Sequence, residues 1–144
     1  MGKVSIVYWS GTGNTEAMAA AMAEGAKEAG AEVELLTVDK ADAAALSEAK
    51  AFALGCPAMG AEVLEEGEME PFMAELDSRI AGKTIALFGS YGWGGGEWMR
   101  DWESRVVSDG AAVLSGEGII ADNVPDDEVL AECRAAGAKL AALV

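Results

Sequence analysis

Six consecutive residues near the start of the chain, 10–15 with the sequence SGTGNT, have the composition of a phosphate-binding loop. They follow the apolar run 3–9 and lead into a helical pattern over about 14–29, so backbone N–H groups and the helix dipole would face an anion. The hydroxyl and amide side chains of the loop add hydrogen-bond donors. An ordinary N-cap turn is the simpler alternative, because the same residue types are favoured there. The candidate anion-binding residues are Ser10, Gly11, Thr12, Gly13, Asn14 and Thr15.

The loop lacks the defining residues of two common nucleotide-binding motifs. A P-loop needs a lysine after its last glycine, whereas Gly13 is followed by Asn14. A dinucleotide fingerprint needs a third glycine, and that position holds Glu16. We therefore expect a neutral loop that anchors one terminal phosphate without transferring it.

Two further loops carry residues that suit a flat ligand. Residues 56–66, CPAMGAEVLEE, place Met59 and Gly60 in an expected turn, and residues 90–98, SYGWGGGEW, place Trp93 among four glycines. An exposed tryptophan is costly unless something planar stacks on it, and methionine packs well against aromatic rings. One phosphate, one planar ring and no histidine to act as a base indicate a mononucleotide-like cofactor such as FMN.

The composition excludes several function classes. The 144 residues include 10 basic and 25 acidic side chains, a formal net charge of −15, which argues against nucleic-acid binding and favours partners with basic surfaces. Acidity that serves solubility alone is the alternative reading. The absence of histidine excludes His-dependent triads and His-ligated metals, and Cys56 and Cys133 form no metal or redox motif.

Apolar runs alternate with helical patterns along the chain, which predicts one α/β domain over 1–144 with a parallel sheet. No apolar stretch is long enough to span a bilayer and no signal-peptide pattern is present, so we expect a cytoplasmic protein. The expected strands are 3–9, 32–38, 51–56, 83–90 and 111–121, the last interrupted at 115–118, and the expected helices are 14–29, 41–49, 69–80, 96–108 and 126–142.

Large apolar residues at helical spacing are expected to pack against the sheet rather than to contact a cofactor. These are Met18, Met22, Met69, Phe72, Met73, Leu76, Ile80, Trp98, Trp102, Val106, Val129, Cys133 and Leu140.

Three segments, VYWSGTGNTE, GCPAMG and ALFGSYGWGGGEWMRDW, together resemble the flavodoxin family in order and spacing over nearly the whole chain. The resemblance is strongest to the short-chain type of anaerobic bacteria, because the interruption at 115–118 is too short for the long-chain insertion. It implies a doubly wound five-stranded parallel sheet of order 2-1-3-4-5 with helices on both faces, and a non-covalently bound FMN.

The resemblance also implies roles for individual residues. Ser90 would add a hydroxyl to the phosphate site, Met59 and Trp93 would cover opposite faces of the flavin ring, and Glu62 would accept a hydrogen bond from flavin N3. Backbone N–H groups around Gly92 would reach the pyrimidine oxygen. The implied cofactor-binding residues are Ser10, Gly11, Thr12, Gly13, Asn14, Thr15, Pro57, Ala58, Met59, Gly60, Ala61, Glu62, Ser90, Tyr91, Gly92, Trp93 and Gly94.

The function implied by the resemblance is that of a low-potential one-electron carrier without substrate turnover of its own. The Gly60 carbonyl would accept the N5–H of the semiquinone after a peptide flip, which glycine makes accessible. Acidic, apolar surroundings would disfavour the anionic hydroquinone, and FMN would shuttle between these two states. The expected partners are reductases and low-potential oxidoreductases with basic docking surfaces, with no nucleic acid and no membrane involved, and we expect a monomer.

Other interpretations remain open from the sequence. An FMN-dependent reductase with its own small substrate, such as a quinone, is the main one. A domain without the cofactor that serves interaction is the other. A response-regulator receiver, which shares the sheet order, is rejected because it needs an aspartate at the end of the third strand, where residues 55–57 read GCP.

Overall fold

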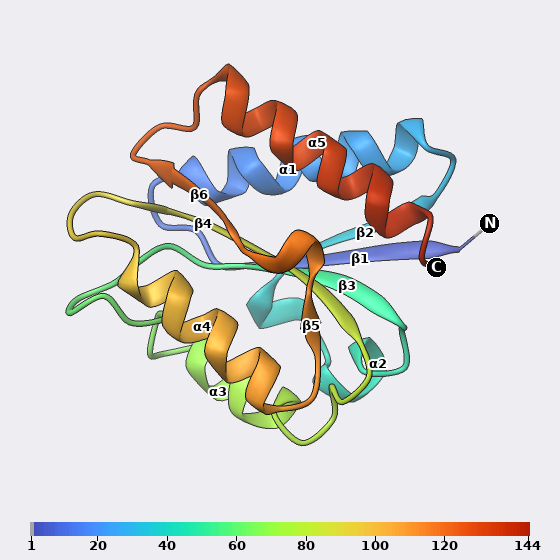
Figure 1. The fold of residues 1–144 in the computed structure, drawn as a ribbon, viewed down its shortest axis with the longest axis horizontal. Helices are drawn as coiled ribbons and strands as arrows, with labels where there is room; N and C mark the ends of the chain where they lie inside the picture. The colour runs from blue at the N-terminus through green and yellow to red at the C-terminus, as the bar shows by residue number, and fades with distance from the viewer. Residues whose placement is uncertain (1) are drawn as a thin grey trace.

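Apolar runs and helix-period segments fold into parallel strands and crossover helices across residues 2–144, the part of the chain that the computed structural model describes (Figure 1). The strands are β1 Lys3–Tyr8, β2 Glu32–Thr37, β3 Ala51–Gly55, β4 Thr84–Tyr91, β5 Ala112–Val113 and β6 Ile119–Asp122. The helices are α1 Asn14–Glu28, α2 Ala43–Leu46, α3 Met69–Leu76, α4 Glu97–Ser108 and α5 Asp127–Ala141, and two 3-10 turns are η1 Val38–Lys40 and η2 Leu114–Gly116.

The strands form one parallel sheet of order β2-β1-β3-β4-β5, and β6 also pairs with β4. This arrangement confirms the expected doubly wound fold and the order 2-1-3-4-5. Because β2 lies on one side of β1 and β3 on the other, the winding reverses at β1. Ligands of such sheets bind at the carboxyl ends of the strands beside this reversal.

The fifth strand is split into two short segments. β5 pairs with the first half of β4, and β6 pairs with the second half. Between them Ser115 and Gly116 have φ values of 63° and 88°, left-handed conformations that interrupt an extended strand. The expected strand 111–121 therefore becomes two strands beside one neighbour, and the sheet has six strands rather than five.

Helices cover both faces of the sheet (Figure 1). α1 and α5 lie on one face, and α3 and α4 lie on the other together with the short α2. Alternate residues of β1 serve the two layers, since Val4 and Ile6 pack in the α1–α5 core and Val7 packs in the opposite one. The expected core residues of the helices are buried, apart from Val129, which is half-buried.

Two helices differ from their expected ranges. α2 has four residues instead of the expected 41–49, and α3 ends at Leu76 instead of continuing to Ile80. The N–H of Arg79 donates to the Leu76 carbonyl at 2.8 Å, so a tight turn replaces the last helical turn. Ile80 reaches the core from this turn and is buried.

Candidate functional site

The three loops that the sequence singles out leave the carboxyl ends of β1, β3 and β4, which are neighbouring strands. Backbone hydrogen bonds tie these ends together. The N–H of Trp9 donates to the Gly55 carbonyl at 3.0 Å, and the N–H of Ala58 donates to the Ser90 carbonyl at 3.0 Å. The fold thus brings together three loops that lie far apart in the sequence.

The loop 10–15 folds around the side chain of Ser10. The N–H groups of Gly13 and Glu16 donate to Ser10 Oγ at 3.2 and 3.3 Å. Gly13 has a φ of 95°, a left-handed value that glycine adopts without steric cost, and it caps the start of α1. Ser10 Oγ therefore occupies two N–H groups at this helix N-terminus, a place that favours an anion.

Thr15 and Ser90 connect this loop to the end of β4. Both side chains are buried, their Oγ atoms lie 3.3 Å apart, and the N–H of Ser90 donates to Thr15 Oγ1 at 3.4 Å. The pair holds α1 against β4 and keeps two hydroxyls beside the anion-binding loop.

Residues 59–63 form a tight hairpin in the second loop. Met59 and Val63 exchange both backbone hydrogen bonds at 2.9 Å. Gly60 and Glu62, inside the turn, have φ values of 50° and 56°. The expected turn is present, and its Met59 side chain faces a cavity.

Glu62 points away from that cavity and toward α4. Its Oε1 accepts the N–H of Glu97 at 3.1 Å, and its carboxylate lies so close to Gly94 that a Cβ there would overlap it. The expected contact of Glu62 with flavin N3 stays a prediction.

The third loop presents Trp93 at the surface, with 55% of the residue exposed. Gly94 and Gly96 have left-handed φ values of 77° and 88°, which only glycine adopts readily. Arg100, on α4, donates to the Gly95 carbonyl at 2.8 Å and supports the loop from its other side.

A cavity of about 280 Å³ lies between the three loops. Among the expected site residues, Ser10, Gly13, Thr15, Gly60, Ala61, Glu62 and Gly94 do not line it. Its walls are formed by Trp9, Gly11, Thr12, Asn14, Pro57, Ala58, Met59, Ser90, Tyr91, Gly92, Trp93 and Asn123.

Two of the lining residues, Trp9 and Asn123, were missed by the sequence reasoning. Trp9 Nε1 donates to Glu68 Oε1 at 3.2 Å, so the indole is held between the first and second loops. Its position directly before the loop 10–15 was an available signal. Asn123 has a φ of 60°, and its N–H donates to the Tyr91 carbonyl at 2.8 Å. No signal marked it, because it follows the split strand.

Acidic side chains surround the second loop, but several are already engaged. The Glu65 carboxylate accepts the N–H groups of Gly67, Glu68 and Met69 at 2.7 to 3.0 Å. Burial opposes its charge, yet these three bonds prevail and lower the pKa of Glu65.

Behind this loop, burial raises the pKa of the Cys56 thiol to about 12, so this cysteine is an inert core residue.

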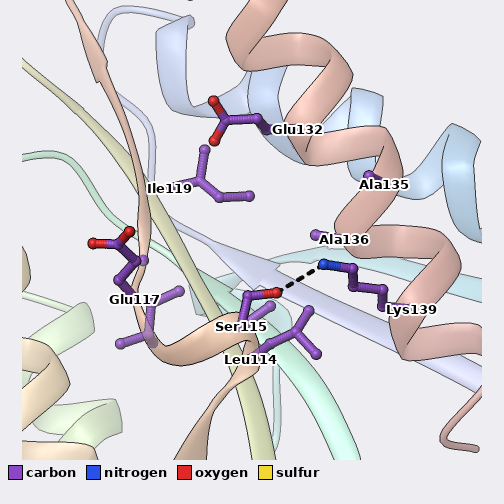
Figure 2. Close-up of a pocket in the computed structure, with 11 residues that line it drawn as sticks. Leu114, Ser115, Glu117, Ile119, Glu132, Ala135, Ala136 and Lys139 are labelled. Carbon is purple, nitrogen blue, oxygen red and sulfur yellow. Dashed lines mark hydrogen bonds between the residues drawn. The ribbon is translucent and has the colours of Figure 1, made fainter.

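A second cavity, of about 240 Å³, lies between α5 and the break that separates β5 from β6 (Figure 2). Lys139 Nζ donates to Ser115 Oγ across it at 2.9 Å, and Glu117 and Glu132 stand at its rim. It contains none of the expected cofactor-binding residues, so we place the functional site in the first cavity.

Across residues 2–144, the helices are too short or too polar to cross a membrane.

Comparisons with known proteins agree with this geometry. The family model described as Flavodoxin matches residues 6–137. The chain is 48% identical to the flavodoxin of Clostridium beijerinckii over 138 residues, covering 96% of this chain and 99% of that protein. It is 46% identical to the flavodoxin of Megasphaera elsdenii over 135 residues, covering 92% and 98%. The solution structure of the two-electron reduced Megasphaera elsdenii flavodoxin superposes with a TM-score of 0.86 at 45% identity, covering 94% of this chain and 98% of that one.

Proposed function

Because the chain belongs to the flavodoxin family, whose members are small FMN-binding electron carriers, we propose that FMN binds between the three loops of this chain and that the protein passes single electrons between redox proteins. One observation carries the assignment of the site. The cavity at the carboxyl ends of β1, β3 and β4 has a polar, donor-rich end and an aromatic end.

The polar end fits a phosphate monoester. The N-terminus of α1 and the side chains of Thr12, Asn14 and Ser90 on the cavity wall supply donors without a mobile cation. A neutral cradle suits a phosphate that serves as an anchor, because the site does not need to stabilise a charge that changes during transfer.

The aromatic end fits a flat ring. The residues that line it are Trp9, Met59, Tyr91 and Trp93. Gly92 keeps this end open, because a Cβ at this position would lie only 3.3 Å from Asn123 Oδ1. Tyr91 is held by Trp98, with ring centroids 5.5 Å apart and a tilt of 46°. Exposed glycine backbone beside soft side chains allows a planar group to lie flat and exclude water.

FMN, when bound, supplies reversible one-electron chemistry, and the chain supplies the surroundings. The hairpin 59–63 offers the Gly60 carbonyl as an acceptor for a proton on the ring, and glycine lowers the barrier for turning that peptide. The acidic second loop makes added negative charge on the ring unfavourable, which would hold the potential low. We expect Pro57, Ala58, Ala61 and Glu62 to complete this side of the site.

Redox partners of this protein are proposed to carry basic docking surfaces. The net charge of −15 would steer such partners toward it. Next to the third loop, the cation of Arg100 is already paired with Glu97 at 3.0 Å. We further propose that residues 1–144 act as a single cytoplasmic domain and that the protein is a monomer.

Comparison of FMN with riboflavin tests the assignment of the site. Purified apoprotein is titrated with each flavin, and flavin fluorescence reports binding. We expect FMN to bind at least tenfold more tightly than riboflavin, because riboflavin lacks the phosphate group. A tenfold difference in Kd corresponds to about 1.4 kcal/mol of binding free energy, which hydrogen bonds from a donor-rich loop to a phosphate can supply. Equal affinities, or no binding of FMN, would overturn the proposal.

A second assay separates a carrier from a flavin-dependent reductase. The FMN-loaded protein is mixed with NADPH and a quinone, first alone and then with a flavoprotein reductase. We expect electron flow only when the reductase is present. Rapid NADPH oxidation by the protein alone would favour an enzyme with its own substrate.

A further inference from the structure

The loop that carries Trp93 is difficult to order by its own composition. Residues 92–96 contain four glycines around one tryptophan, and glycine loses more backbone entropy on ordering than any other residue. Gly96 precedes α4 without a side chain that could cap the helix. Any order in this loop must therefore come from other segments.

One contact comes from the second loop. Glu62 reaches across from the hairpin 59–63 and accepts the N–H of Glu97 at 3.1 Å. This N–H belongs to the first turn of α4, where a negative charge is favoured by the helix dipole. The same carboxylate packs against the bare Cα of Gly94, so any side chain at Gly94 would exclude it.

The other contact comes from α4 itself. Arg100 Nη2 donates to the Gly95 carbonyl at 2.8 Å and to Glu97 Oε1 at 3.0 Å. Arg100 therefore holds the loop backbone and the first residue of α4 with one guanidinium group. Arg100 does not line the cavity, and the sequence reasoning did not include it among the site residues.

We propose that Glu62 and Arg100 form a bracket that holds the Trp93 loop in its ring-covering position before the cofactor binds. Glu62 contacts the loop from the side of the hairpin and Arg100 from the side of α4, and both act at Glu97. Both are positioning residues in this role. The inference rests on the proposed function only in taking FMN as the ligand that Trp93 covers.

A bracket of this kind would act through the free protein. When a binding-competent loop is only partly populated, the apparent affinity falls by that fraction. A loop that is already ordered in the free protein avoids this reduction in affinity. FMN binding then does not have to offset the entropy cost of ordering the loop. Loss of the bracket should therefore slow FMN association more than it speeds FMN dissociation.

The first test measures the apoprotein and needs no cofactor. Amide hydrogen exchange is followed by NMR at Glu97, whose N–H donates to Glu62 Oε1, in wild type, in Arg100→Gln and in the control Arg134→Gln. Arg134 is an exposed arginine on α5 that pairs with Glu24 at 3.4 Å, so the control makes the same charge change elsewhere. We expect exchange of the Glu97 N–H to rise about tenfold in Arg100→Gln, because loss of the charged hydrogen bond to the Gly95 carbonyl loosens the loop beside it. Unchanged exchange relative to Arg134→Gln would overturn the bracket.

The second test measures cofactor binding by stopped-flow fluorescence. In Arg100→Gln the FMN association rate should fall about threefold, and Arg100→Lys should restore part of it because one donor is retained. The midpoint of urea unfolding should match that of Arg134→Gln, which separates positioning from a general loss of stability. An association rate equal to that of the control would overturn the proposal.

A double-mutant cycle with Glu62→Gln tests whether the two residues act on the same loop. We expect the combined effect on loop exchange to be smaller than the sum of the single effects, because either change frees Glu97. Strict additivity would show two independent contacts and contradict a shared bracket. If wild type failed to bind FMN, the proposed function would fail, but the exchange experiments would still decide the bracket.

Discussion

At the scale of single residues, the site depends on two soft side chains that come from different loops. Met59 is fixed by the hairpin with Val63, whereas Trp93 stands on a glycine-rich loop and is more than half exposed. In the proposed binding mode, the cover on the side of Trp93 is therefore the one least constrained by packing. Such a cover would contribute mainly by excluding water from the bound ring.

Replacement of Trp93 by alanine should weaken FMN binding by about 1 kcal/mol, or roughly fivefold in Kd, because one stacked face is lost. Fluorescence titration of the apoprotein with FMN measures the effect. Val107→Ala is the matched control, since Val107 is also more than half exposed but lies on the outer surface of α4. Equal Kd values for the two variants would show that Trp93 does not cover the ring.

Residue types predicted much of this site, but their orientations could not be predicted. Thr12 and Trp93 were identifiable because they stand in glycine-containing loops that directly follow buried strands, and both line the cavity. Trp9 was read as the end of a strand, since only the fold shows that its indole turns to Glu68. Asn123 could not be found, because its place depends on the pairing of β6 with the distant β4.

At the scale of elements, long apolar runs predicted β1, β3 and β4 well, because parallel strands covered on both faces leave a continuous pattern. The split of the last strand could not be fully predicted, because it depends on a left-handed Ser115 and on tertiary pairing.

The close packing of α1 against α5 could not be predicted from the sequence either. A Cβ at Gly25 would overlap the carbonyl oxygen of Arg134, and a Cβ at Gly137 would overlap that of Met22, so these glycines let α1 and α5 touch.

The variant Gly137→Ala should lower the free energy of unfolding by about 1–3 kcal/mol, because an added methyl group forces α1 and α5 apart. This loss would exceed the gain in helix propensity that alanine normally brings over glycine. Urea unfolding followed by circular dichroism measures it. Ala131→Leu, on the exposed face of the same helix, should change little, and a stabilised Gly137→Ala protein would contradict the close contact.

The contact between α3 and α4 should make stability depend on pH. Arg105 on α4 donates to Asp77 at 2.7 Å and to Glu70 at 2.8 Å, which joins the two helices. Asp109 Oδ2 is buried beside this pair and finds no hydrogen-bond partner among residues 2–144. Burial, and then the neighbouring Asp77 carboxylate, raise the pKa of Asp109 to about 6.

The pKa of an aspartate in the unfolded chain is about 4, which is lower than the pKa of Asp109 in the folded protein. Protonation of Asp109 therefore stabilises the folded state, and this contribution to the free energy of unfolding is lost as pH rises from about 4 to 6. The variant Asp109→Asn should therefore be more stable than wild type by about 1 kcal/mol at pH 7, after allowance for partial solvent screening, and the difference should vanish near pH 4. Urea unfolding at several pH values tests this. Asp39→Asn removes an exposed aspartate on η1 as the control, and a gain that is the same at pH 4 and pH 7 would refute the assignment.

At the scale of the whole molecule, charge distribution controls encounters. The net charge of −15 creates a field that extends beyond the surface at low ionic strength, and salt screens it with a Debye length of about 8 Å at 0.15 M. The second loop carries four glutamates within residues 57–68 and lines the cavity through Pro57, Ala58 and Met59, so a partner that approaches the proposed site meets these carboxylates. A basic partner would be steered toward the proposed site.

Electron transfer from the reduced, FMN-loaded protein to cytochrome c, a basic haem protein used as the probe, should slow as salt is added. We expect the second-order rate constant to fall about tenfold or more between 10 mM and 300 mM salt, because steering raises association rates by this order. Glu66→Gln, an exposed position in the second loop, should reduce the slope of the logarithm of the rate against the square root of ionic strength. Glu28→Gln, at the far end of α1, removes the same charge and should leave the slope nearly unchanged. Equal slopes for the two variants would mean that net charge alone, rather than the acidic second loop, guides the partner.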